Sequence, residues 1–215
     1  EVIAFGLFGA VGAAPVALTS GWFDSLSGPG AILASIIVTG LVGFAGIVSS
    51  VGIYRIPARP AWDSPRTTAQ FFATAALLGS LSALGLSLVR PVVSEPVTWS
   101  LAVVAVLSAV VSAGAPWSLV FRSVDSDEAA IRGAAWLMTR RFGRLLTLRT
   151  TALCIVAVLA PVVVSFESTQ LRIIGGVTAL VLALFAEIVG RYLFFVTVVP
   201  RNMPGSFFSK PQGGH

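Results

Sequence analysis

The chain has 215 residues and a net charge of +5; 56% of its residues are apolar and only 11% are charged. A soluble domain carries about 25% charged residues, so this composition excludes the ordinary soluble classes. Several apolar runs exceed the roughly 18 residues that cross about 30 Å of hydrocarbon, and the alternation of a membrane β-barrel is missing. We therefore predict an all-α, polytopic transmembrane helix bundle, forming one integral membrane domain over residues 1–215.

Six membrane spans are predicted from the apolar runs and from the breakers between them. Glycines recur in the first two spans at a spacing that lets helices approach closely. In chain order the predicted spans cover about residues 2–20, 31–54, 67–89, 97–121, 145–166 and 172–199.

The stretch between the fourth and fifth spans reads RSVDSDEAAIRGAAWLMTRRFGR. Asp125 or Ser126 is suited to cap a short helix, in which an apolar side opposes a row of arginines. We predict an amphipathic helix over about residues 127–143 that lies at the membrane surface. The alternative is a solvated loop.

The chain is poor in metal-ligating side chains. Cys154 is its single cysteine and His215 its single histidine. One thiol cannot hold an iron–sulfur cluster, a zinc site or an internal disulfide, and a haem in a bundle needs axial ligands, commonly histidines. We expect no haem and no metal in this chain, and we expect Cys154 to be a small buried apolar side chain.

Basic residues gather on one side of the predicted topology. Six spans place residue 1, the loops after the second and fourth spans and the C-terminal tail on the same side. By the positive-inside rule that side is cytoplasmic, although docking of a soluble partner would produce the same asymmetry. The basic side carries Arg55, Arg59, Arg66, Arg122, Arg132, Arg140, Arg141, Arg144, Arg201 and Lys210, against Arg90 and Arg172 on the other side.

Two charges lie inside the sixth predicted span. Glu187 and Arg191 are four positions apart, so they share one face of a helix. One such charge costs about 2.5–3.5 kcal/mol near the membrane centre, and pairing reduces that cost. We predict a structural ion pair between Glu187 and Arg191; the alternative is a polar patch beside a redox or proton-carrying ligand.

Three stretches resemble one protein family. EIVGRYLFFVTVVPRNMPG, residues 187–205, resembles the C-terminal helix of the membrane anchor subunits of dimethyl sulfoxide reductase-type molybdoenzymes. SSVGIYRIPARPAWDSPRTTAQFFATAALLG, residues 49–79, is similar to a second family signature, with Gly52 where the family has Met. EVIAFGLF, at the start, is similar to the end of the element that opens the family's third helix, with Glu1 as its acid. The resemblance implies eight family helices, of which the first two precede residue 1.

The resemblance implies a haem-free anchor subunit that binds quinol or quinone, with menaquinone expected. It implies two partners: an iron–sulfur subunit with four clusters, and a molybdopterin catalytic subunit. The chain would be a non-catalytic subunit of an oxidoreductase complex that serves electron transport in anaerobic respiration. We expect it in the cell membrane of a prokaryote, in contact with lipid and not with nucleic acid, with its basic face and C-terminus cytoplasmic.

Five residues on the predicted basic side are suited to quinone chemistry. The resemblance gives Glu1 as the quinol-binding acid, and a carboxylate there can accept a quinol proton; the family's histidine has no counterpart in this chain. Tyr54 and Trp62 offer an aromatic wall and a hydroxyl, and Arg55 and Arg59 offer hydrogen-bond donors to a developing anion. The alternatives are the aromatic belt of any membrane interface for Tyr54 and Trp62, and topology or partner docking for the arginines.

Two other classes of membrane protein stay open. A small-solute or ion transporter typically has ionisable groups near the middle of the membrane and helices that are interrupted there. Prolines interrupt several runs here, but the one acid inside a predicted span, Glu187, is predicted to pair with Arg191, which disfavours proton-coupled transport. A purely structural membrane scaffold is the second alternative.

Overall fold

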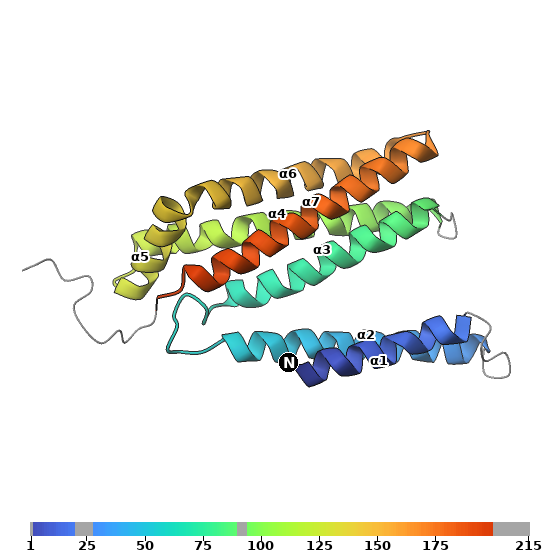
Figure 1. The fold of residues 1–215 in the computed structure, drawn as a ribbon, viewed down its shortest axis with the longest axis horizontal. Coiled ribbons are helices and arrows are strands. Elements are labelled where there is room, and N and C mark those ends of the chain that lie inside the picture. Colours follow the sequence, from blue (N-terminus) through green and yellow to red (C-terminus); the bar gives the residue numbers. More distant parts are fainter. Residues whose placement is uncertain (1, 20–27, 90–93, 200–215) are drawn as a thin grey trace, which may run out of the picture. The chain divides into compact units, whose positions relative to one another are not determined.

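A computed structural model describes residues 2–19, 28–89 and 94–199, and within those ranges it contains helices and turns but no strand (Figure 1). This confirms the predicted all-α fold. The elements in chain order are α1 (Val2–Thr19), α2 (Pro29–Tyr54), α3 (Pro65–Val89), α4 (Glu95–Val124), α5 (Ala129–Trp136), the π-helix η2 (Leu137–Arg141), α6 (Gly143–Ser165) and α7 (Thr169–Val196).

The predicted spans correspond to the long helices. In the described part of the chain, α2, α3, α4, α6 and α7 are long and apolar enough to cross a membrane, and a shorter apolar helix covers Gly6–Leu18 within α1. Helices α2, α3 and α4 each begin two residues before the predicted span. The reason is that a proline occupies one of the first two positions of each, Pro29, Pro65 and Pro96, where a missing N–H costs nothing.

The chain divides into two compact units, Glu1–Arg55 and Ile56–His215. In the first unit α1 packs on α2. A Cβ added to Gly43 would lie only 2.8 Å from Cε2 of Phe8, so the glycine gives the ring room against α2. The hydroxyl of Thr39 lies 3.3 Å from the Val11 carbonyl of α1 and 2.8 Å from the Ser35 carbonyl of its own helix. These contacts confirm the close approach of helices that the glycine spacing predicts.

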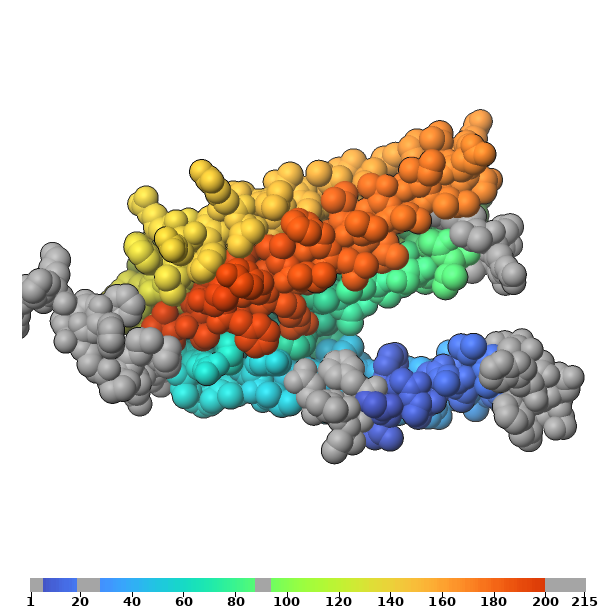
Figure 2. Space-filling model, viewed as in Figure 1, coloured from blue at the N-terminus to red at the C-terminus, as the bar shows by residue number. Residues whose placement is uncertain are grey.

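The second unit is a bundle in which α3 packs on α4 and α7, and α6 packs on α4 and α7. Many small side chains lie in its centre beside buried leucines such as Leu77, Leu81 and Leu153, and they let the helices lie close together. Many other large apolar side chains point outward. Figure 2 shows α7 on the visible face of this bundle, beside α3. The buried small residues include Ala102, Ala105, Ala109, Ala152, Ala160, Ala179, Ala183 and Ala186, and the exposed apolar residues of α7 include Ile174, Val177, Val181, Leu184 and Ile188.

One end of this bundle is basic. It holds the start of α3, the end of α4, α5, η2, the start of α6 and the end of α7 (Figure 1). Ile131 and Ala134 of α5 are buried in an apolar cluster with Leu119, Leu146 and Leu193. The exposed arginines there are Arg122, Arg132, Arg140, Arg141 and Arg144.

A helical segment therefore exists where the amphipathic helix is predicted, and its apolar side packs on the bundle end. Its position at a membrane surface remains a prediction. Cys154, expected to be buried, is exposed on α6; that expectation is wrong, because the apolar run that contains it also supplies the outward face of a membrane helix.

Candidate functional site

The loop between α2 and α3 is held against α7 by Trp62. The indole Nε1–H donates to the Phe194 carbonyl at 2.9 Å. The indole ring stacks on the Phe194 ring, with centroids 5.0 Å apart and planes 7° apart. Trp62 is buried, with 5% of its surface exposed. Its N–H is therefore committed to the chain itself, and its ring is largely covered by Phe194, Phe195 and Arg59.

Polar side chains before and after Trp62 in the sequence also contact this loop and hold it in place. The Arg59 guanidinium carbon lies 4.3 Å from the centroid of the Trp62 ring, a cation–π contact. The Thr67 hydroxyl donates to the Trp62 carbonyl at 2.6 Å, and Arg66 Nη2 donates to the Ala61 carbonyl at 2.7 Å. The first turn of α3 thus fixes the loop that precedes it.

Arg149 of α6 is fully buried and joins three helices. Its Nη1 donates to the Ser112 carbonyl of α4 at 2.8 Å, and its Nε donates to the Ala186 carbonyl of α7 at 3.2 Å. Its Nη2 lies 3.5 Å from Oε1 of Glu187, an ion pair with 0% and 5% of the two side chains exposed. A buried cation needs both a counter-charge and acceptors for its donors, and α4 and α7 supply them.

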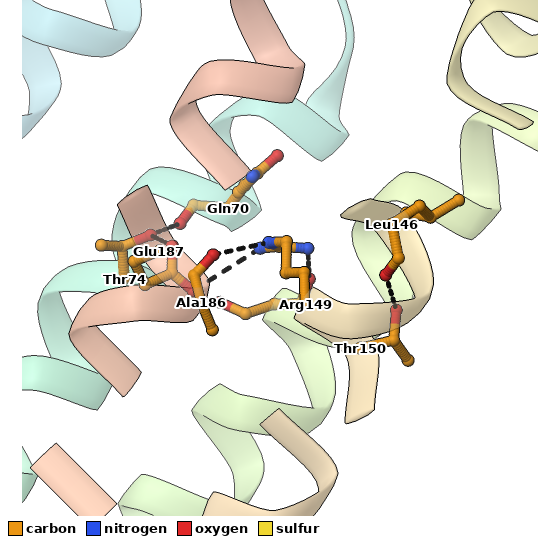
Figure 3. A network of polar contacts seen from close by, with 8 residues as sticks. Gln70, Thr74, Leu146, Arg149, Thr150, Ala186 and Glu187 are labelled. Atoms are coloured by element: carbon orange, nitrogen blue, oxygen red, sulfur yellow. Dashed lines mark hydrogen bonds and ion pairs between the residues drawn. The ribbon is translucent and has the colours of Figure 1, made fainter. Parts of the chain in front are cut away.

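Glu187 is also bonded to α3 (Figure 3). The Thr74 hydroxyl lies 2.6 Å from Glu187 Oε2 and 2.9 Å from the Gln70 carbonyl. A hydroxyl carries one hydrogen, so Thr74 donates to one acceptor at a time, and an ionised Glu187 is the stronger of the two. The row Gln70–Thr74–Glu187–Arg149 therefore connects α3, α7 and α6 through the inside of the bundle.

Gly190 leaves the space that Arg149 occupies. A Cβ added to Gly190 would lie 3.0 Å from Cζ and from Nη2 of Arg149, and closer still to Nε. Any larger residue at this position would displace the guanidinium from its acceptors on α4 and α7.

Arg191 packs on an aromatic ring. Its guanidinium carbon lies 3.8 Å from the centroid of the Phe71 ring, and Phe71 in turn meets Phe194 edge to face at 6.2 Å. The predicted pairing of Glu187 with Arg191 remains a prediction, whereas the ion pair of Glu187 with Arg149 is present in the structure.

A narrow cavity opens at the basic end of the second unit. The empty space is about 370 Å³ when the open mouth of the cavity is included. The part between the cavity walls has room for about one water molecule. Arg66, Gln70 and Arg149 supply most of its polar lining. The remaining lining residues are Ala61, Trp62, Pro116, Leu119, Met138, Gly190, Leu193, Phe194, Thr197 and Val198.

The five residues predicted to bind quinone fall into three groups. Glu1 lies outside the described residues. Tyr54, half-buried, and Arg55, exposed, end α2 in the first unit. Arg59 and Trp62 belong to the second unit and contact each other, and Trp62 lines the cavity. The structure therefore brings Arg59 and Trp62 together, and a common site for all five residues remains a prediction.

Sequence reasoning missed three polar residues inside the bundle: Arg149, which is fully buried, Gln70, which is buried, and Thr74, which is half-buried. A signal for Arg149 exists, because a charged residue inside an apolar span is rare and needs a partner. Gln70 and Thr74 carry no comparable signal. Uncharged polar residues are common on packed membrane helices, and only the fold shows that the Thr74 hydroxyl lies between Glu187 and the Gln70 carbonyl.

The ion pair makes a prediction about assembly. Replacing Glu187 by Ala leaves Arg149 buried without a counter-charge, so we expect a loss of about 3–5 kcal/mol of stability and a lower yield of folded protein. Thermal unfolding in detergent, with folded protein measured by size-exclusion chromatography, checks this. Glu167→Ala, at an exposed glutamate, is the control and should behave as the wild type. Equal midpoints for both variants would show that the pair contributes nothing.

Gly190 makes a second prediction. Gly190→Ala forces the Arg149 guanidinium to move, and overpacking of this kind costs about 1–3 kcal/mol. The matched control is Gly114→Ala on α4, where an added Cβ meets nothing within 4 Å and alanine favours the helix. We expect the unfolding midpoint to fall for Gly190→Ala and to hold or rise for Gly114→Ala. A Gly190→Ala variant as stable as the control would contradict the close contact with Arg149.

The comparison with protein families gives one match. A family model described as DMSO reductase anchor subunit (DmsC) matches residues 31–196, which include every helix of the second unit. No curated protein and no solved structure matches the chain.

Proposed function

The chain belongs to the DMSO reductase anchor subunit family, and from this premise we propose that it binds quinol or quinone and exchanges electrons with an iron–sulfur partner subunit. Its several apolar helices and its family make it a membrane anchor of a molybdoenzyme complex. Family membership favours this role over that of a solute transporter.

The observation that carries the proposal is the gathering of aromatic and cationic side chains at the basic end of the second unit. Arg59 lies over Trp62, and Trp62, Arg66 and Gln70 line one cavity. A quinone head group is a flat ring with two oxygens, so it suits a site that combines aromatic surface with hydrogen-bond donors. The cavity itself is narrower than such a ring, so we place the head group outside it.

The sequence assigns Glu1, Tyr54 and Arg55 to quinone chemistry as well, and the proposal gives each of them a role. Quinol oxidation releases two electrons and two protons. In this proposal the Glu1 carboxylate accepts a proton from a quinol hydroxyl, and the Tyr54 hydroxyl orients the ring. Arg55 and Arg59 stabilise negative charge that develops on the quinol oxygen. We propose menaquinone as the carrier, in keeping with a role in anaerobic respiration.

We propose that electrons pass to or from a partner with four iron–sulfur clusters, and from there to a molybdopterin subunit. The exposed arginines of the basic end, among them Arg132, Arg140 and Arg144, suit the docking of a soluble acidic surface. In the proposed orientation this end is cytoplasmic, in the cell membrane of a prokaryote. Both directions of electron flow use the same site, because the same groups bind quinol and quinone.

Purification of the complex tests whether the chain acts as an electron-transfer anchor. We expect the purified chain to carry with it proteins that contain molybdenum and iron–sulfur clusters, measured by metal analysis and by the electron paramagnetic resonance of reduced clusters. An intact complex that contains neither metal would overturn the proposal.

Glu1 tests the quinone site. Glu1→Gln keeps the shape of the side chain but removes its basicity, so we expect quinol-linked turnover of the complex to fall by about 10²-fold or more, the range of general acid–base catalysis. Turnover with an artificial dye, which bypasses the membrane site, should be unchanged. Glu167→Gln is the control. A parallel fall in both activities would assign Glu1 to assembly instead.

A further inference from the structure

Three arginines lie close together in the sequence where η2 meets α6. Arg140 and Arg141 end η2, Arg144 lies in the first turn of α6, and all three are exposed. None of their side chains makes a hydrogen bond, an ion pair or a ring contact with another described residue. They differ in this from Arg59 and Arg149, whose guanidinium groups contact the chain itself.

The surrounding sequence offers these arginines no counter-charge. Residues 129–165, which make up α5, η2 and α6, include no aspartate or glutamate, and the sequence after residue 199 includes none either. The acids that come nearest before them in the sequence, Asp125, Asp127 and Glu128, precede α5. Three like charges within five positions repel one another, so the cluster is suited to hold an anion from outside the chain.

An outward stripe on α6 begins at this cluster. Its positions recur every three or four residues, so they share one face of the helix, and all of them are exposed. From Leu148 to Val162 the stripe runs about 21 Å along the helix axis, which is longer than the roughly 15 Å of one membrane leaflet. The stripe consists of Arg144, Leu148, Thr151, Ile155, Val158 and Val162.

The arginines and the stripe together limit what the anion is. A free phosphate would use the arginines alone, and a soluble acidic protein does not extend into hydrocarbon. A phospholipid uses both features, because its phosphate suits guanidinium groups and its acyl chain suits an apolar helix face. Trp136 of α5 is 58% exposed, and its ring is of the kind that lies at the level of lipid head groups.

We propose that Arg140, Arg141 and Arg144, with the outward stripe of α6, form a binding site for one anionic phospholipid. The guanidinium groups hold the phosphate by charge-assisted hydrogen bonds, and the stripe lies along an acyl chain. The proposed function gives the exposed arginines of this end to an acidic partner. For these three the adjoining stripe favours a lipid, and Arg122 and Arg132 remain for the partner. The lipid site does not depend on the quinone proposal.

Lipid retention measures the site. The purified complex is mixed in detergent with equal amounts of phosphatidylglycerol, which is anionic, and phosphatidylcholine, which is not. Gel filtration removes free lipid, and mass spectrometry quantifies the lipid that stays bound. We expect an excess of phosphatidylglycerol, since each arginine near a head group contributes about a fivefold preference. Equal retention of the two lipids would overturn the proposal.

Matched variants assign the excess to the cluster. Arg144→Gln should lower it about fivefold, whereas Arg122→Gln removes an exposed arginine of the same end outside the cluster and should leave it unchanged. Arg144→Lys keeps the charge and should keep most of the excess, which separates loss of charge from loss of folding. Equal effects of Arg144→Gln and Arg122→Gln would show a general response to positive charge and overturn the assignment.

Two further measurements separate the lipid from other anions. An excess of inorganic phosphate should not displace the phosphatidylglycerol, because phosphate has no acyl chain; displacement would identify a site for free anions and overturn the proposal. The combined variant Arg140→Gln, Arg141→Gln and Arg144→Gln should keep its molybdenum and iron–sulfur partners. Loss of those partners with an unchanged lipid ratio would assign the three arginines to the partner instead.

Discussion

The buried guanidinium of Arg149 constrains how the helices around it can pack. A cation inside a membrane protein is tolerated only when charge and hydrogen bonds compensate the water it has lost. Here the compensation comes from a carbonyl of α4, a carbonyl of α7 and the Glu187 carboxylate. Three helices must therefore hold fixed positions and rotations, because a shift of any one of them removes an acceptor.

Small residues make this arrangement possible. Gly190 sits where a side chain would strike the guanidinium, and Ala186, whose carbonyl accepts from Arg149, is itself fully buried. Apolar association is weak in lipid, so close packing and interior polar contacts supply much of the specificity of a membrane bundle. The alanine-rich centre and the Arg149 network thus act on the same helices by two mechanisms. The same network also brings a charged donor to the wall of the cavity.

The sequence was sufficient to predict the helices, but it predicted only some of the polar contacts between them. Apolar run length predicted the five long helices and the shorter apolar helix of the described part of the chain, because a span must cover the hydrocarbon whatever it packs against. Glu187 stood out for a similar local reason, as an acid in an apolar run. Arg149 carries the same local signal, a charge in an apolar run, but helical periodicity compares residues a few positions apart and cannot find its contact with Glu187 across 38 positions. Trp62 was predicted as an aromatic wall, but only the fold shows its bond to the Phe194 carbonyl.

The contact between Trp62 and Phe194 joins residues 132 positions apart in the chain. While the ribosome is still making the fifth span, the loop that carries Trp62 has already emerged, and its fastening does not yet exist. Of the described helices, α7 is synthesised last, so the contact that holds this loop in place can form only after the rest of the bundle has been made.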